Sequence, residues 1–224
     1  SDLRGKRIGI PEWAQTASIY TRGWLVHQIG IPLQEIEWVQ GGVNGAGRKE
    51  KVKLNIPDGV SYTPRQDKSL TDMLFDGEID CIMSAHPPTP VEEGKDTIVH
   101  LYPNYREVEE QYYRDTGIFP IMHVIAMRGD FFRENRWVAT NLYKAFEEAK
   151  NRALFRATEM TATRMPFAWC YEAAQKAKDL FGDDFFPYGI EKNRTTLEAF
   201  LQYGFEQGVC QRKLEVEELF PEEV

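Results

Sequence analysis

The sequence predicts an α/β fold, and two observations carry that prediction. In the first half of the chain, short apolar segments alternate with segments of helical periodicity, and near Ile118 this alternation gives way to helical spacing alone. Alternating strands and helices are typical of a layered fold with a largely parallel sheet. We therefore expect an α/β lobe over residues 1–116, and a crossing strand followed by a mainly helical part over residues 117–224.

Four strands and two helices are expected in the first lobe. Short apolar runs predict the strands Ile8–Ile10, Ile36–Val39, Val60–Thr63 and Cys81–Ala85. Pro11 ends the first strand, because proline has no amide hydrogen to give a sheet. Helical spacing follows over Thr16–Ile29 and Ser69–Phe75, whereas the glycine- and lysine-rich stretch 41–58 predicts a surface excursion.

The second half of the chain is expected to begin with one strand and continue as helices. The run Ile118–Met127 is apolar and contains β-branched residues, so it predicts a long strand. Helices are expected over the ranges 135–161, 166–181 and 193–206. Asn193 is a suitable cap for the last of these helices, and Gly208 is suited to end it.

The composition of the chain indicates which classes of partner the protein is suited to bind. The net charge of −8 argues against nucleic acid, which prefers a basic face, but it allows a small aromatic or carboxylate ligand. The sequence has no apolar run of about 18 residues that would predict a membrane span. Cys81, Cys170 and Cys210 are widely spaced and the four histidines are scattered, so we expect no metal site. A cytoplasmic location suits unpaired thiols, and assembly into a homo-oligomer is left open.

The junction between the first strand and the first helix is a candidate ligand site. It places Thr16, Ala17 and Ser18 at a helix N-terminus, where free backbone amides and the positive end of the helix dipole favour an anion. The other reading is an ordinary capped helix, in which Thr16 satisfies its own amides.

Several motifs make the chain resemble the 4,5-dihydroxyphthalate decarboxylase family. They are the opening Gly-Lys-Arg-Ile-Gly-Ile-Pro run, Asp72–Asp80, Leu101–Tyr105, Thr116–His123 and Asp183–Gly189. The opening run is common among binding proteins, whereas Thr-Gly-Ile-Phe-Pro-Ile-Met-His and Pro-Tyr-Gly are more specific. The resemblance extends from about Asp2 to Phe220, nearly the whole chain.

The resemblance implies a type II periplasmic-binding-protein-like fold, with one complete lobe and the helical C-terminal part of the other. The family pattern has further strands and helices before the equivalent of Asp2, so we expect this chain to be a fragment. The implied activity is conversion of 4,5-dihydroxyphthalate to 3,4-dihydroxybenzoate and carbon dioxide without a cofactor. A periplasmic solute-binding protein for a small organic anion is the alternative, because folds of this kind serve both purposes.

Two loops of the first lobe supply further candidates for binding or catalysis. Gly42 follows a strand and can let the backbone approach a ligand, and Arg48 can grip a carboxylate with two hydrogen bonds. His86 follows the strand that begins at Cys81, and the carboxyl end of a parallel strand is where α/β folds place ligands. The family pattern often has arginine at this position. Arg48 and His86 equally suit exposed loops.

The remaining candidates lie beyond the first four predicted strands. His123 is in the predicted crossing strand, and an imidazole there can deliver a proton, although a histidine in such a run is also a common core residue. Asn104 and Tyr105 follow Pro103 in a predicted turn, where an amide and a phenol suit recognition of ring hydroxyls. They also suit a simple polar surface turn.

Overall fold

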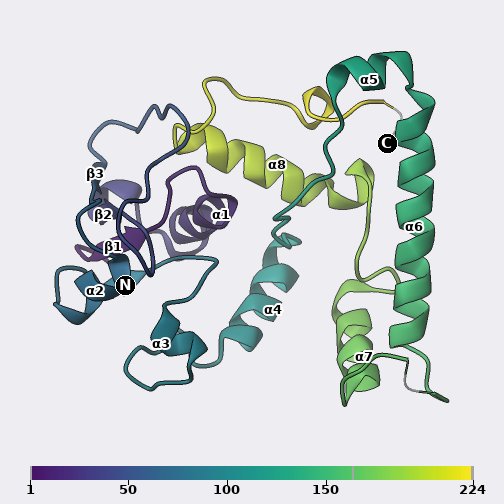
Figure 1. Ribbon diagram of the computed structural model, residues 1–224, viewed down its shortest axis with the longest axis horizontal. Coiled ribbons are helices and arrows are strands. Elements are labelled where there is room, and N and C mark those ends of the chain that lie inside the picture. Colours follow the sequence, from purple (N-terminus) through teal and green to yellow (C-terminus); the bar gives the residue numbers. More distant parts are fainter. Residues whose placement is uncertain (1, 163, 223–224) are drawn as a thin grey trace. The chain divides into compact units, whose positions relative to one another are not determined.

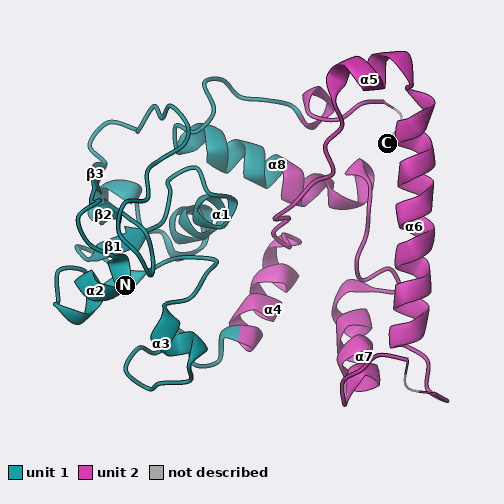
Figure 2. Ribbon diagram, viewed as in Figure 1, with its two compact units in different colours: residues 1–105, 198–215 teal, residues 106–197, 216–224 magenta. Residues whose placement is uncertain are grey.

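The computed structural model describes residues 2–162 and 164–222, and the chain divides into two compact units (Figure 2). Residues 1–105 and 198–215 form the first unit, and residues 106–197 and 216–224 form the second. Throughout these described residues, no helix is both long and apolar enough to cross a membrane. All three cysteines are described, and each is a free thiol.

A four-stranded parallel sheet forms the centre of the first unit (Figure 1). Its strands are β1 (Arg7–Ile10), β2 (Glu37–Gln40), β3 (Ser61–Pro64) and β4 (Cys81–Ile82). They lie in the order β3-β2-β1-β4, so β1 has a neighbour on each side. The predicted α/β architecture is confirmed, and β4 ends earlier than the predicted strand.

Helices connect these strands as the sequence predicts. Helix α1 (Thr16–Trp24) begins at the predicted residue and continues as a π-helical turn over Leu25–Ile29. Helix α2 (Leu70–Phe75) is capped by Ser69, whose hydroxyl oxygen accepts a hydrogen bond from the Asp72 amide at 3.1 Å. The short α3 (Thr89–Glu92) follows β4.

Apolar side chains cover both faces of the sheet. Ile8 and Ile10 are fully buried in one cluster with Trp13, Leu25 and Trp38. On the other face, a Cβ at Gly9 would lie 2.8 Å from a methyl of Ile79 and 2.9 Å from one of Leu70. The absence of a side chain at Gly9 therefore lets the α2 layer pack directly on β1.

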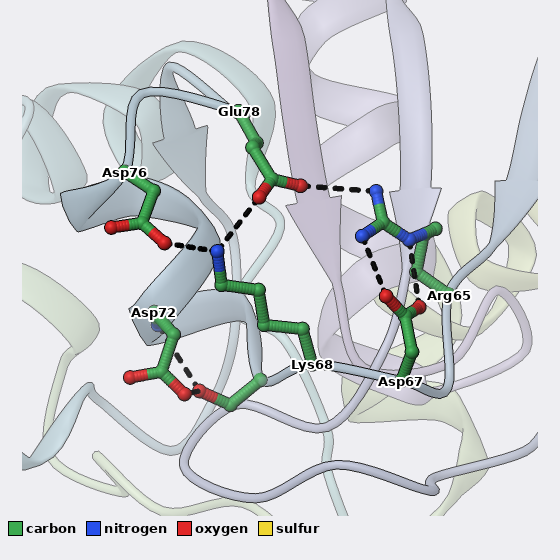
Figure 3. Close-up of polar contacts among 7 residues, drawn as sticks. Arg65, Asp67, Lys68, Asp72, Asp76 and Glu78 are labelled. Carbon is green, nitrogen blue, oxygen red and sulfur yellow. Dashed lines mark hydrogen bonds and ion pairs between the residues drawn. The ribbon is translucent and has the colours of Figure 1, made fainter.

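A partly exposed network of charged groups joins the loops on either side of α2 (Figure 3). Lys68 bonds both Asp76 and Glu78, and Glu78 also pairs with Arg65 at 3.1 Å. Arg65 holds Asp67 through two hydrogen bonds of 2.8 Å, which lowers the pKa of that carboxyl to about 2. Water and salt screen charges in this position, so we infer that the network mainly fixes loop geometry.

The second unit is helical. It contains α5 (Gly129–Glu134), α6 (Trp137–Ala157), α7 (Cys170–Phe181), most of α4 (Tyr105–Thr116) and the first eight residues of α8 (Ile190–Glu206), whose remaining residues belong to the first unit. Among the residues of this unit that the structure describes, the best-buried charge is Lys150, whose ammonium lies 2.7 Å from Glu147 and 2.8 Å from Asp184. Asp184 comes from the Asp183–Gly189 motif, so one part of this motif anchors α6.

The predicted strand over Ile118–Met127 is wrong. Every residue from 117 to 128 is described, and none is in a helix or a strand. A strand needs a neighbour for its backbone groups, and no described segment pairs with this one. The apolar run is largely exposed, with Val124 at 63% and Ile125 at 73%.

Two helix starts also differ from those predicted. Helix α7 begins at Cys170 instead of Pro166, and α8 begins at Ile190, so Asn193 lies inside the first turn and is not the cap. The Asn193 amide instead donates to the carbonyls of Pro187 and Gly189, both at 2.9 Å. Gly208 lies just beyond α8 with a φ of 70°, which confirms its predicted role in ending that helix.

Close packing between α1 and α8 generates a stability prediction. A Cβ at Gly23 would lie well inside van der Waals contact with the Tyr203 ring. Gly23→Ala should therefore lower the free energy of unfolding by about 1–3 kcal/mol through overpacking. That loss opposes the gain of about 1 kcal/mol that alanine normally brings to a helix. Chemical denaturation of both variants measures the difference.

Gly45→Ala is the matched control, because a Cβ there meets nothing within 4 Å. It should change stability by less than about 0.5 kcal/mol. Equal stability of the two variants would contradict the packing at Gly23.

Candidate functional site

The loops that follow β1, β2 and β4 start at one edge of the sheet. The Gly41 amide donates to the Ile10 carbonyl at 3.1 Å, and the Met83 amide donates to the Gly9 carbonyl at 2.9 Å. These bonds hold the beginnings of the neighbouring loops against the end of β1. In open α/β sheets this carboxyl edge is the usual place for ligands.

The first turn of α1 has unused hydrogen-bonding capacity at this edge. Gln15 precedes the helix in an extended conformation and provides no side-chain cap. Within the described ranges, the amides of Thr16, Ala17 and Ser18 have no hydrogen-bond acceptor. Ser18 is 2% exposed, and its Oγ also has no partner there. Three free amides and a buried hydroxyl suit an anion, so the self-capped reading of Thr16 is wrong.

A buried arginine lies beneath this turn. Arg22 is on α1 and has no exposed surface, and its guanidinium carbon is 3.9 Å from the centre of the Trp13 ring. Nε donates to Gln207 at 2.9 Å and Nη2 donates to the Trp13 carbonyl. Burial lowers the pKa of Arg22 to about 9, while the negative charge of Glu50 opposes that effect. The side chain therefore keeps its charge at neutral pH.

Glu50 brings a carboxylate to the same turn. Its Oε2 accepts hydrogen bonds from the Trp13 amide at 2.6 Å and from the Ala14 amide at 3.3 Å. Its Oε1 accepts from the Lys51 amide at 3.1 Å. The loop after β2 is thereby joined to the turn that leads into α1.

Arg48 is engaged in an ion pair within the protein. Its Nε and Nη2 both bond Oε1 of Glu12, at 2.8 and 2.6 Å, and Lys51 approaches the same oxygen at 3.2 Å. The Glu12 side chain is 8% exposed, so this carboxylate is a buried anion that needs a cation. Arg48 thus has a structural partner, and binding of a ligand by it stays a prediction.

Gly42 and His86 lie in two loops that contact each other. A Cβ at Gly42 would clash with the Gly45 carbonyl, which gives this glycine a packing role. Asn44 links the loops, donating to the Pro87 carbonyl at 3.2 Å and accepting from the Thr89 amide at 2.8 Å. His86 is exposed in this arrangement. The structure thus brings the Gly42 and His86 loops to the edge where α1 begins.

Asn104 and Tyr105 are exposed, and the ring contacts of this stretch are with other parts of the first unit. The Tyr105 ring lies 5.3 Å from that of His100, and the nearby Tyr102 packs edge-on against Trp24 at 5.8 Å. Trp24 ends α1, about 12 Å along the helix from its first residue. The ring contacts of this stretch thus involve the C-terminal end of α1, and the role of Asn104 and Tyr105 stays a prediction.

His123 belongs to the second unit and is exposed on the irregular segment described above. Its role stays a prediction.

Sequence reasoning missed Arg22, Glu50 and Tyr62. The Tyr62 ring lies 5.4 Å from Trp13 at a steep angle, and burial raises its pKa to about 12. Its hydroxyl has no partner among the described residues. The spacing of Arg22 from Ser18, four residues on, was an available signal, since side chains on a helix point toward its N-terminus. Nothing local marks Glu50, which meets Trp13 across 37 positions.

A parallel sheet of four strands connected by helices places the chain among the α/β proteins. No family model matches it. The chain is 32% identical over 221 residues to the 4,5-dihydroxyphthalate decarboxylase of Comamonas testosteroni, covering 98% of this chain and 67% of that protein. It is also 32% identical over 115 residues to the Pseudomonas putida protein of that name, covering 51% of this chain and 45% of the relative. The chain therefore belongs to the 4,5-dihydroxyphthalate decarboxylase family.

Replacing Ser18 distinguishes a role of its unpartnered hydroxyl in ligand binding from a role in the stability of the fold. Ser18→Ala removes a buried polar atom that has no partner, so stability should stay within about 0.5 kcal/mol or rise. The affinity for benzoate, a minimal aromatic carboxylate, should fall roughly threefold to tenfold. Denaturation and calorimetric titration measure the two effects.

Ser69→Ala is the matched control, because that serine caps α2. It should cost about 1 kcal/mol of stability and leave benzoate affinity unchanged. If Ser18→Ala behaved like this control, the hydroxyl would have no role in binding.

Proposed function

We propose that the protein removes one carboxyl group from a dihydroxylated aromatic dicarboxylate such as 4,5-dihydroxyphthalate, giving a dihydroxybenzoate without a cofactor. The observation that supports this most strongly is the first turn of α1, where three free amides and the buried Ser18 hydroxyl suit a carboxylate. The similarity to named decarboxylases over 98% of the chain supports the reaction type. The two-lobed periplasmic-binding-protein-like arrangement is part of the same proposal.

The reaction needs only a proton and a suitably substituted ring. A ring hydroxyl para to the departing carboxylate pushes electron density into the ring, and an acid protonates the carbon that bears this carboxylate. The bond to the carboxylate then breaks, its electron pair restores the aromatic ring, and carbon dioxide leaves. The protein must hold the retained carboxylate, supply the acid and bind the hydroxyls.

The candidate residues divide among these tasks. Thr16, Ala17 and Ser18 bind the retained carboxylate through backbone amides and hydroxyls, and Gly42 and Arg48 are proposed to assist them. His123 is the proposed acid and His86 the second candidate, since an imidazole exchanges protons near neutral pH. Asn104 and Tyr105 are proposed for the ring hydroxyls.

Binding without chemistry is the second candidate function. Both named relatives are decarboxylases, which favours the enzyme. Measuring the release of carbon dioxide distinguishes the two functions, because only the enzyme produces it.

Turnover of 4,5-dihydroxyphthalate by the full protein tests the proposal. We expect carbon dioxide and 3,4-dihydroxybenzoate in equal amounts. Phthalate, which lacks the electron-releasing hydroxyls, should bind and remain intact. Binding of both compounds with no carbon dioxide from either would establish the binding-protein function instead.

Replacing the proposed acid tests the mechanism. His123→Gln keeps much of the side-chain volume and polarity but removes the titrating group, so turnover should fall by roughly two to four orders of magnitude. The affinity for phthalate should change little. Because His123 is exposed, the variant is not expected to disturb the fold.

His86→Gln is the matched comparison, with the same chemical change at another exposed histidine. Near-normal turnover in His123→Gln together with a large loss in His86→Gln would assign the acid to His86.

A further inference from the structure

The turn before α1 already holds a carboxylate, and this carboxylate comes from the chain itself. Oε2 of Glu50 lies 2.6 Å from the Trp13 amide and 3.3 Å from the Ala14 amide. Successive backbone amides that point at one oxygen form a typical anion site. The geometry therefore identifies a second group of amide donors, immediately before Thr16, Ala17 and Ser18.

Glu50 does not use all the donors around it. Nη1 of the fully buried Arg22 has no partner among the described residues, and neither has the buried hydroxyl of Tyr62. The charge of Glu50 influences the pKa of both groups, so they lie within its electrostatic reach. A buried cation with an unused N–H group favours a further anionic oxygen.

Glu50 lies in an irregular stretch between β2 and β3. The stretch from 44 to 60 contains no helix or strand, and all of it is described. Lys49, Lys51 and Lys53 are exposed. Arg48 holds one side of the stretch through Glu12, and the Asn55 amide holds the other through the Gly208 carbonyl at 2.8 Å. Release of Glu50 breaks neither of these anchors.

We propose that the amides of Trp13 and Ala14, backed by Arg22, are a carboxylate subsite that Glu50 fills in the free protein and that a ligand carboxylate takes over. The identity of the ligand rests on the proposed function. A phthalate-like compound carries two adjacent carboxylates, and the turn presents two successive groups of amides. One carboxylate replaces Glu50 at Trp13 and Ala14, and the other binds at Thr16, Ala17 and Ser18.

Phthalate binding to a Glu50→Gln variant tests the subsite. Glutamine has nearly the same shape, but as a neutral group it binds the amides less strongly than a carboxylate does. The dissociation constant for phthalate should therefore fall roughly tenfold. Glu37→Gln is the matched control: it removes one exposed carboxylate from the same unit, on β2, and should change the constant less than twofold.

Hydrogen exchange in the unmodified protein detects displacement directly. Addition of phthalate should speed exchange of backbone amides over residues 49–53 as Glu50 leaves, and should slow exchange at residues 13–18. In Glu50→Gln, exchange over 49–53 should be fast already and respond little to phthalate. This measurement decides the proposal even if the variant fails to fold.

Two results would overturn the subsite, and two combinations of results would separate it from the proposed function. Unchanged or weaker phthalate binding by folded Glu50→Gln would overturn the subsite, and so would unaltered exchange over 49–53 on addition of phthalate. Turnover of 4,5-dihydroxyphthalate together with either result would leave the proposed function standing. Tighter binding by the variant without any turnover in the unmodified protein would support the subsite and refute the decarboxylase.

Discussion

A fully buried guanidinium joins the beginning of the first unit to the end of α8. Arg22 donates to the Gln207 side chain and the Trp13 carbonyl, and its flat face covers the Trp13 ring. Gln207 bonds back to the Ile19 carbonyl at 2.9 Å, and its own carbonyl accepts from the Trp13 indole at 2.8 Å. Removing the guanidinium would leave two buried acceptors, the Gln207 side-chain oxygen and the Trp13 carbonyl, without this donor, which costs more than the hydrogen bonds themselves contribute. The β1–α1 turn depends on this arrangement for its position, and so does everything that the turn presents.

Local sequence signals were enough for the first unit. The strand at Ile8, the interruption at Pro11 and the helix start at Thr16 each follow from residue types within a few positions, and all three are confirmed. Ser69 likewise marks the start of α2 by its capping chemistry. The same local signals failed at Ile118–Met127, because strand formation depends on a neighbouring strand as well as on apolar composition.

The candidate site was predictable in its position and less so in its chemistry. The carboxyl edge of the sheet and the free amides at Thr16 follow from topology and helix geometry. Arg22 was missed because arginine is normally an exposed residue, and its burial depends on Gln207, which is 185 positions away. Glu50 was missed because its partners are backbone amides, which no residue type reveals. The long-range polar contacts thus determine which charged groups surround the turn, whereas local sequence determines only that a turn is there.

The burial of Trp13 affects the intrinsic fluorescence of the protein. Trp13 and Trp38 have no exposed surface, whereas Trp137 is 64% and Trp169 is 77% exposed. A water-soluble quencher such as iodide will therefore extinguish the emission of the two exposed indoles far more than that of the buried pair. The remaining short-wavelength emission includes that of Trp13 and Trp38, and the Trp13 ring is in direct contact with the Arg22 cation. A change in the charges near this turn shifts the wavelength or the intensity of the Trp13 fluorescence. Intrinsic fluorescence therefore reports such changes without an added label.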